Sequence, residues 1–401
     1  MLPPRPWLKK CWQQKVNNEL KKLLLAQFLT ALADNAILFV AVAMVIQGAL
    51  HGDWYIPALQ ACFLVAFVVL APWVGTFADT TSKPKVLILA NIIKALGAAM
   101  MLLHVQPLLA YAVVGVGAAM YSPAKYGILP ELTTNEDGLM KGNSWIEGST
   151  IVAILLGTVV GAKIADQSIF LALIGVLVVY LLSALIAMWM SPLPAAHPKE
   201  SKGILGSFKA TISTLLETPP ARFATLGVSL FWASAVTLRL IIIAWAPVTL
   251  LLTTSEEISL LTLFIALGIA SGALLAPRLI PMHKLKRTQM AAYGLSVAIL
   301  LLMLTDNINN ARLLLFIAGL CGGLFVVPIN ALLQDIGHHS VGSGHAVAVQ
   351  HFFENIAMLT ATSLYTWAVS NSIQATTSML VLGIFILVAT TIIAYKLPKD
   401  S

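Results

Sequence analysis

Residues 23–49, LLLAQFLTALADNAILFVAVAMVIQGA, form an apolar stretch of the length that a helix needs to cross a bilayer. About 20 apolar residues in a helix span the roughly 30 Å of hydrocarbon. Asp34 and Asn35 lie near the middle of this stretch. A carboxylate at that depth costs roughly 2.5–3.5 kcal/mol on insertion scales, so we expect it to face the protein interior or a wet cavity and to have a partner there. Asp34 is therefore the first candidate for a functional site.

The composition of the whole chain indicates a polytopic membrane protein. Of its 401 residues, 59% are hydrophobic and only 10% are charged. Repeated long apolar runs exclude a membrane β-barrel, whose strands have about ten alternating residues. The net charge of +7 comes from Lys and Arg gathered between apolar runs, which indicates topology rather than nucleic-acid binding. Cys11, Cys62 and Cys321 have no metal-like spacing, and neither a metal nor another cofactor is expected.

Twelve apolar segments are predicted to cross the membrane, which makes the fold all-α. The predicted spans are 23–49, 56–78, 86–104, 108–130, 139–165, 169–190, 221–250, 257–280, 288–305, 312–334, 343–369 and 373–396. With a cytoplasmic N-terminus, most basic residues fall in cytoplasmic connections, and the outer ones keep little beyond Lys163 and Arg312. Both termini are therefore expected in the cytoplasm.

The longest polar interruption divides the chain into two halves of six spans. Each half has a tight connection after its second span, a proline in its fourth, and a fifth span that opens with Gly-Asn or Gly-His and carries an acid. Such ordered self-similarity is typical of duplicated transporters that handle substrate between the halves. The expected parts are a basic N-terminal segment at 1–22, bundles at 23–190 and 221–396, a linker with an amphipathic run at 191–220, and a tail at 397–401.

The loop GTFADTTSKPK at 75–85 has the Gly, Asp and Lys spacing of the connection between spans two and three in the major facilitator superfamily. Asp79 is expected to face a helix N-terminus or a cation, and Lys83 to anchor the loop at the membrane surface. Other segments resemble the bacterial lysophospholipid transporters of this superfamily, notably YSPAKYGILPELT at 121–133 and VVPINALLQ at 326–334. The resemblance covers nearly the whole chain.

Further segments carry the same resemblance, in the same order along the chain. They are AQFLTALADNAILF at 26–39, GNSWIEGSTIVAILLG at 142–157, SLFWASAVTLR at 229–239 and GHAVAVQHFFENIAML at 344–359. His345 and His351 depart from the family, in which Asn is expected at both positions, and so does the basic extension before residue 21.

Polar side chains on the first span are candidates for substrate binding. Gln27, Thr30 and Asp34 recur at i, i+3 and i+7, so they form one polar stripe that we expect to face a central cavity, with Asn35 beside it. An alternative is that Asp34 only holds a neighbouring helix through hydrogen bonds.

The second half offers further candidates for headgroup recognition. Arg239 lies well inside the seventh span and is expected to approach the space that Asp34 faces; its guanidinium suits phosphate. Trp232, seven residues earlier, suits an ammonium group or an acyl chain. Gln350 and Glu354 share a face of the eleventh span, with Asn355 beside them. They are candidates for ammonium recognition, and an alternative is that Arg239 simply neutralises Glu354.

Four charged residues in the N-terminal half are predicted to form an inner gate together with Asp79 and Lys83. They are Lys94, Lys125, Glu131 and Glu147. Two cations and two acids suit a gate that opens when the pairs exchange, although a permanent structural network is an alternative. Removing one partner of a buried pair costs about 3–5 kcal/mol in either role.

The resemblance implies inward flipping of lysophosphatidylethanolamine and lysophosphatidylglycerol across the bacterial inner membrane. It also implies supply to a cytoplasmic-face acyltransferase that rebuilds diacyl lipid. The partners expected are thus a lysophospholipid, the lipid bilayer and that acyltransferase, with no nucleic acid; a monomer is compatible with the sequence.

Three other functions remain open at this point. A proton- or sodium-coupled exporter of amphipathic cations would use Asp34 and Glu354 as coupling sites. A membrane acyltransferase or lipase is disfavoured because the sequence has no H-x-x-x-x-D pair and no G-x-S-x-G elbow. A non-transporting scaffold for the acyltransferase would tolerate Asp34→Asn and Arg239→Ala, whereas a transporter would lose flipping.

Overall fold

The computed structural model describes residues 6–48, 55–133, 135–192, 203–252, 255–282 and 284–397. Side chains before Asn17 lie outside this description, as do most of the polar linker and the end of the tail. Within the described ranges the protein consists of thirteen helices and the all-α fold predicted from the sequence is confirmed. Ten of the helices are long and apolar enough to cross a membrane.

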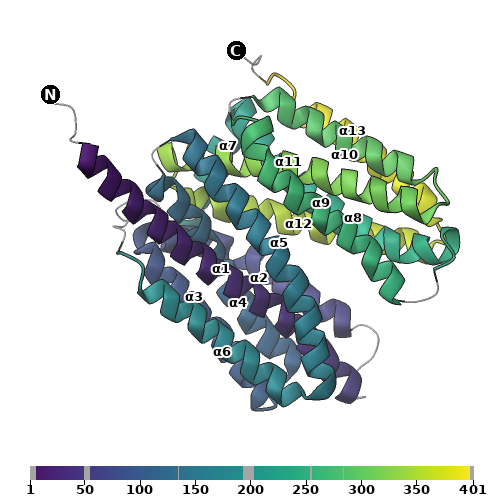
Figure 1. Cartoon of the computed structure of the whole chain (residues 1–401), viewed down its shortest axis with the longest axis horizontal. Helices are drawn as coiled ribbons and strands as arrows, with labels where there is room; N and C mark the ends of the chain where they lie inside the picture. Colours follow the sequence, from purple (N-terminus) through teal and green to yellow (C-terminus); the bar gives the residue numbers. More distant parts are fainter. Residues whose placement is uncertain are drawn as a thin grey trace.

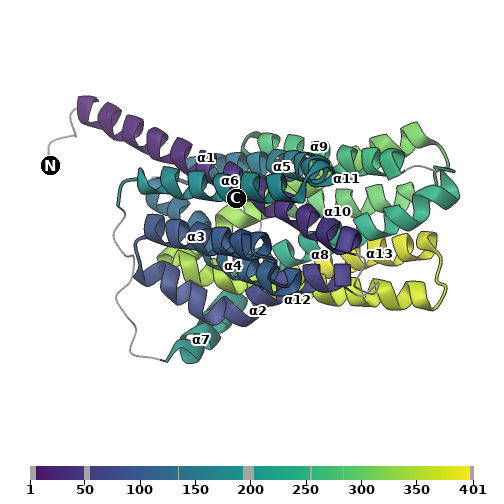
Figure 2. The same ribbon diagram turned by 90° about the horizontal axis from the view of Figure 1, so that it is seen from below.

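The first bundle contains the six helices before the linker (Figure 1). They are α1 (Pro6–Gly48), α2 (Tyr55–Thr80), α3 (Lys83–Leu102), α4 (Pro107–Leu132), α5 (Glu136–Gln167) and α6 (Ile169–Met188). In α1 the basic N-terminal segment continues without a break into the first span, because no Pro or Gly interrupts the helix after Pro6. Figure 2 shows this first part of α1 projecting beyond the other helices.

The second bundle contains six long helices and follows a short one in the linker. The short helix is α7 (Ile204–Glu217), and the long ones are α8 (Pro219–Thr249), α9 (Ser255–Leu279), α10 (Leu285–Leu302), α11 (Ile308–His339), α12 (Ser343–Ser370) and α13 (Ala375–Ile393). α10 and α12, although predicted to cross the membrane, are not among these ten helices. α10 carries Lys286 and Arg287 in its first turn, which lower its mean hydropathy, and α12 carries His, Gln and Glu in its first half.

Glycines let α9 and α11 approach closely. A side chain at Gly268 or Gly272 on α9 would overlap the α11 backbone, and one at Gly319 or Gly323 on α11 would overlap the α9 backbone. Small residues four apart allow this kind of contact between membrane helices, where lipid provides no hydrophobic drive for association. These two helices therefore form the tightest pair of the second bundle.

The two bundles meet at one end of the molecule and diverge toward the other (Figure 1). Contacts between them run mainly through α2 with α12 and α5 with α9, and through α4 with α12. We call the end where α2 ends and α12 begins the sealed end. α1 begins and α13 ends on the same side (Figure 1). A functional site between the bundles must therefore lie between the sealed end and the end where the bundles diverge.

Candidate functional site

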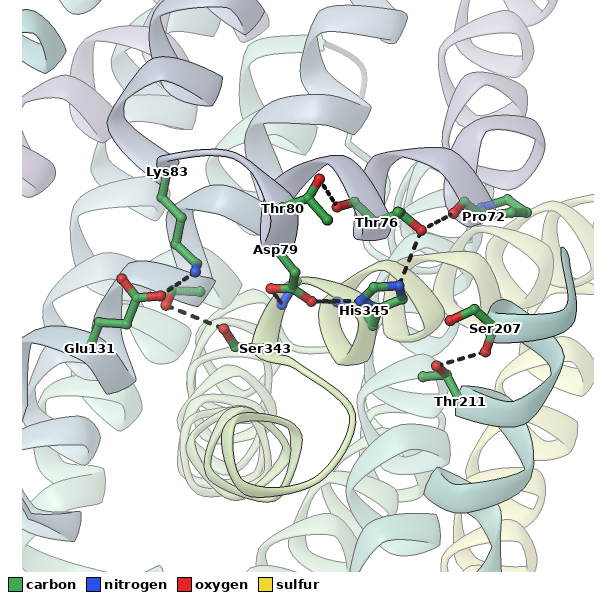
Figure 3. A network of polar contacts seen from close by, with 12 residues as sticks. Pro72, Thr76, Asp79, Thr80, Lys83, Glu131, Ser207, Thr211, Ser343 and His345 are labelled. Carbon is green, nitrogen blue, oxygen red and sulfur yellow. Dashed lines mark hydrogen bonds and ion pairs between the residues drawn. The ribbon is translucent and has the colours of Figure 1, made fainter. Parts of the chain in front are cut away.

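Asp79 ties the two bundles together at the sealed end. Its side chain is fully buried at the end of α2. It accepts hydrogen bonds from the backbone N–H groups of Gly344 (2.8 Å) and His345 (2.9 Å) in the first turn of α12. His345 Nδ1 lies 2.7 Å from the same carboxylate, and its Nε2 lies 3.1 Å from Thr76 Oγ1 (Figure 3). A carboxylate at a helix N-terminus satisfies the free N–H groups there and meets the positive end of the helix dipole.

The start of α12 fits against α2 because both contain a glycine at the contact. A methyl group at Gly75 would lie 3.1 Å from His345 Cα, and one at Gly344 would lie 2.7 Å from Asp79 Oδ1. Neither position has room for a side chain unless the helices move. The glycines thus allow the carboxylate to reach the α12 backbone.

Lys83, the first residue of α3, forms an ion pair with Glu131 near the end of α4 (Figure 3). The Lys83 side chain is completely buried. This pair lies within the first bundle. The adjacent Ser343 hydroxyl donates to the Gly127 carbonyl at 3.4 Å and connects the same region to α12.

A second set of contacts joins α5 to the second bundle. Asn143 and Gln334 exchange two hydrogen bonds of 2.9 and 2.7 Å between α5 and α11. Ser144 donates to the Ala273 carbonyl of α9 at 2.7 Å. All three polar side chains are buried, so their amide and hydroxyl groups would be costly to leave without partners if the bundles separated here.

A chain of buried polar groups continues toward the middle of the molecule. Glu147 accepts from the Tyr126 hydroxyl (2.7 Å) and, across the bundle interface, from Asn330 Nδ2 (3.1 Å). Asn330 Oδ1 in turn accepts from Gln350 Nε2 (3.0 Å), which also donates to Glu354 (2.5 Å). Two carboxylates, one from each bundle, are therefore connected through neutral amides. We call Glu147, Glu354 and the groups between them the central acid chain.

His351 brings a third connection between the bundles at this depth. Its Nδ1 lies 2.7 Å from Glu354 Oε2, and its Nε2 lies 2.6 Å from Ser122 Oγ on α4. Asn355 donates to the His351 carbonyl of its own helix (2.7 Å) and is buried there. The histidine therefore positions Glu354 against the first bundle.

Lys125 on α4 is a buried cation beside the central acid chain. Its side chain is 7% exposed, and its ammonium lies 3.9 Å from the centre of the Tyr126 ring. Glu147 and Glu354 are close enough to act on it electrostatically. In the described part of the chain its ammonium makes no hydrogen bond or ion pair, in contrast to Lys83 and Lys94. A buried ammonium without a direct counter-ion is suited to receive an anionic ligand.

Asp34 binds Lys94 inside the first bundle. Its Oδ2 lies 2.8 Å from Lys94 Nζ on α3, and its Oδ1 accepts from the Tyr180 hydroxyl of α6 at 2.8 Å. Lys94 also donates to Thr30 (3.1 Å), whose hydroxyl donates to Asn91 at 2.7 Å. Lys94 is 1% exposed and the Asp34 side chain 20%. Asp34 is thus neutralised by Lys94 of α3 and also bound by Tyr180 of α6, both within its own bundle.

The other two polar residues of the α1 stripe also make contacts within the first bundle. Gln27 is 3% exposed and donates to Thr150 on α5 at 3.0 Å. Asn35 donates to the Ala31 carbonyl one turn earlier in the same helix. We expected the stripe to face a central cavity. Its side chains bond instead to α3, α5 and α6, because polar residues of those helices provide hydrogen-bond partners.

The approach of Arg239 to the space that Asp34 faces stays a prediction. Its side chain is exposed on α8, and among the described residues it has no bond to Asp34 or Glu354. Asp34 pairs with Lys94 of its own bundle, and Glu354 bonds to Gln350 and His351 of its own helix. Trp232 is half-buried and packs edge-on against Phe231, with ring centroids 5.1 Å apart.

The four charges that were expected to form one gate are divided among three places. Lys94 pairs with Asp34, Glu131 with Lys83 at the sealed end, and Glu147 bonds across to α11. Lys125 lies beside Glu147 and makes no ion pair among the described residues. Residues at the same depth in the membrane can point in different directions, because each helix has its own rotation about its axis. The sequence gives the depth of a residue but not this rotation.

Several neutral partners were missed in the sequence. Tyr180, Asn91, Asn330, Gln334 and Tyr126 all bond to charged or amide groups of the site. Their signal was available, because a polar side chain within an apolar span requires a partner there.

Comparisons with known proteins agree with this architecture. Residues 23–362 match the model of the Major Facilitator Superfamily. Among solved structures, the fucose:proton symporter FucP of E. coli superposes with a TM-score of 0.75 at 14% identity, covering 94% of this chain and 97% of that one. The human organic anion transporter MFSD10 gives 0.78 at 15% identity, covering 97% and 100%. At such identities the likeness shows the fold alone.

Closer relatives exist among bacterial proteins. The chain is 42% identical over 348 residues to "Lysophospholipid transporter LplT" of Klebsiella pneumoniae (strain 342), which covers 86% of this chain and 87% of the relative. It is 43% identical over 347 residues to the protein of the same name in Serratia proteamaculans, with 86% and 87% covered. The chain therefore belongs to the major facilitator superfamily and, within it, to the LplT family.

Proposed function

We propose that this protein transports lysophospholipids, and that it moves them from the outer to the inner leaflet of the bacterial inner membrane by alternating access. The observation that carries the proposal is the identity of 42–43% over 86% of the chain to transporters named for that substrate. The substrates we propose are lysophosphatidylethanolamine and lysophosphatidylglycerol. An acyltransferase at the cytoplasmic face would consume the product, and the transporter would act as a monomer.

The distribution of basic residues supports placing the sealed end in the cytoplasm. Lys and Arg follow α2, precede α8 and α10, and follow α13, all at the sealed end, whereas Lys163 and Arg312 lie toward the opposite end. Positive residues are retained on the cytoplasmic side of membrane proteins. Both termini would then be cytoplasmic, and this arrangement would be open toward the outer side.

The central acid chain and Lys125 supply opposite charges for a zwitterionic headgroup. The Lys125 ammonium has no direct counter-ion among the described residues, so it is free to bind the phosphate. Glu354, held by Gln350 and His351, would bind the ammonium of the ethanolamine group. Both groups lie at the interface of the bundles, where a ligand bound to one bundle also contacts the other.

The sealed end would open after the headgroup has entered. That step must break the bonds of Asp79 to α12 and the exchange between Asn143 and Gln334. A headgroup bound at Glu354 would compete with Gln350 and His351 for that carboxylate. Because His351 also bonds to Ser122 of the first bundle, and Gln350 to Asn330, which bonds to Glu147, this competition would weaken the interface. Only a ligand that binds the two arrangements differently can shift the balance between them.

A flipping assay tests the proposal. Purified protein is reconstituted into liposomes with fluorescent lysophosphatidylethanolamine, and albumin extracts the lysolipid that remains in the outer leaflet. We expect a protected fraction that grows with time, absent from empty liposomes and absent for the diacyl lipid. No protected lysolipid, with or without a proton or sodium gradient, would refute the proposal and favour export of amphipathic cations. Conversion of lysolipid to diacyl lipid by the protein alone would also refute it.

A further inference from the structure

A large apolar groove lies within the second bundle, away from the charged residues. It has a volume of about 680 Å³ and is lined by α8, α12 and α13. Ligand pockets in proteins typically enclose about 300–1,000 Å³. α12 and α13 hardly touch each other, although each packs on α8, so α8 forms the floor of the groove. In the first bundle the corresponding helices α5 and α6 are closer together over α1.

The groove is long enough to cross the middle of the membrane. On α13 its lining runs from Thr377 to Ile393, and on α8 from Leu226 to Ile241. At a helix rise of 1.5 Å per residue these distances are about 24 and 22 Å. The hydrocarbon of a bilayer is about 30 Å thick. The groove is therefore longer than one leaflet.

The lining of the groove does not favour a polar ligand. No charged residue lines it. Five of its seven hydroxyl groups donate to the backbone of their own helix or a neighbour, among them Ser234 to Leu230 (2.6 Å), Thr237 to Ala233 (2.8 Å) and Tyr365 to Leu240 (3.4 Å). A polar ligand would lose its hydration here without gaining hydrogen bonds. The apolar lining therefore favours a hydrocarbon chain as the ligand.

The volume of the groove fits one hydrocarbon chain. A methylene group takes about the space of a water molecule, about 30 Å³, so a chain of sixteen needs on the order of 500 Å³. The groove, at about 680 Å³, has room for one such chain, so a lipid with a single tail fits.

On α12 the groove lies on the same helical face as the central acid chain. Its lining residues Ala357, Ala361 and Ala368 continue the helical face that carries Gln350 and Glu354. Ala368 lies fourteen residues beyond Glu354, about 21 Å along the helix. Three bonds of an extended chain advance about 3.6 Å, so an 18-carbon tail reaches about 20 Å and a 12-carbon tail about 13 Å.

We propose that the groove between α8, α12 and α13 binds the acyl chain of the transported lysolipid while its headgroup lies at Glu354. This inference rests on the proposed function. The tail then points toward the end of α12 opposite the sealed end. A lipid from that side would already be inverted, with its headgroup at mid-depth and its tail directed back toward the leaflet from which it came.

The test measures uptake of lysolipids of two chain lengths by wild-type protein and by groove-filling variants in liposomes. Ala368→Trp fills the far end of the groove, and Ala368→Leu fills less of it. Gly175→Trp on α6 is the matched control, because Gly175 is exposed and a Cβ atom there would meet no atom within 4 Å. We expect Ala368→Trp to lower uptake of the 18-carbon lysolipid at least tenfold and that of the 12-carbon lysolipid less than twofold. The leucine variant should be intermediate and the control unchanged.

Crosslinking identifies the occupant directly. A lysolipid with a photoreactive group at the end of its 18-carbon tail should label α12 near Ala368 or the facing part of α13. Unlabelled lysolipid should compete, and diacyl phospholipid should not. Labelling that diacyl lipid removes would overturn the inference, because the groove would then hold bilayer lipid. Equal loss of both chain lengths in Ala368→Trp would also overturn it. If wild-type protein moves no lysolipid of either length, the proposed function fails instead.

Discussion

Replacing Asp79 by Asn should release the sealed end. The carboxylate accepts the N–H groups of Gly344 and His345 and also meets His345 Nδ1. The amide keeps the size of the side chain but has only one accepting oxygen and no charge. Hydrogen bonds to charged groups contribute about 1.5–3 kcal/mol each, and a favourable, partly buried charge at a helix terminus contributes up to about 2 kcal/mol. We expect the closed arrangement to lose about 2–3 kcal/mol relative to the open one.

That loss corresponds to a shift of about 30- to 140-fold in the balance between the two arrangements, since about 1.4 kcal/mol is a factor of ten. It can be measured as a distance distribution between spin labels at Lys85 and Ser340, on a background without the native cysteines. Asp79→Asn should enrich the longer distance. Asp335→Asn is the control, because Asp335 pairs with the exposed His339 at 3.5 Å and such surface pairs contribute little. An unchanged distribution in Asp79→Asn would show that the α12 cap does not hold the bundles together.

Further substitutions separate binding from stability. Lys125→Gln should lower lysolipid uptake at least tenfold with a normal melting temperature, whereas Lys209→Gln on the exposed face of α7 should not; equal uptake in both would remove Lys125 from the headgroup site. Asp34→Ala leaves Lys94 buried without its partner and should destabilise the protein by about 3–5 kcal/mol. The melting temperature in detergent should fall, and the second substitution Lys94→Met should restore it. A normal melting temperature for Asp34→Ala would contradict the pairing. Arg239→Ala should change stability by no more than about 0.5 kcal/mol, because the residue is exposed, and lower uptake if the guanidinium meets the headgroup during the cycle; unchanged uptake would leave it no role.

The all-α fold could be predicted because it depends on hydropathy along the chain, although ten and not twelve of the described helices are long and apolar enough to cross a membrane. Twelve apolar runs, a basic loop and a polar linker were sufficient for the all-α fold. α1 is longer than its apolar core, since Pro6–Gly48 forms one helix. Hydropathy marks the part of a helix that lies in lipid, and it gives no information about how far the helix continues into water.

The partners of the charged residues could not be predicted in the same way. Asp34 was recognised as a buried acid, but whether it faces Lys94 or Arg239 depends on how α1 is rotated about its axis. That rotation is decided by Tyr180, Asn91 and Thr30 together. A sequence read one helix at a time gives the depth of a side chain, and its direction follows only from packing.

The glycine contacts of α9 and α11 also have a consequence for purification. Backbones that approach so closely leave no space for a detergent molecule between them. The interface of the two bundles is instead held by polar bonds such as Asn143 with Gln334, which competing water can replace. In a harsh detergent the two bundles should therefore separate first, while α9 and α11 remain packed against each other.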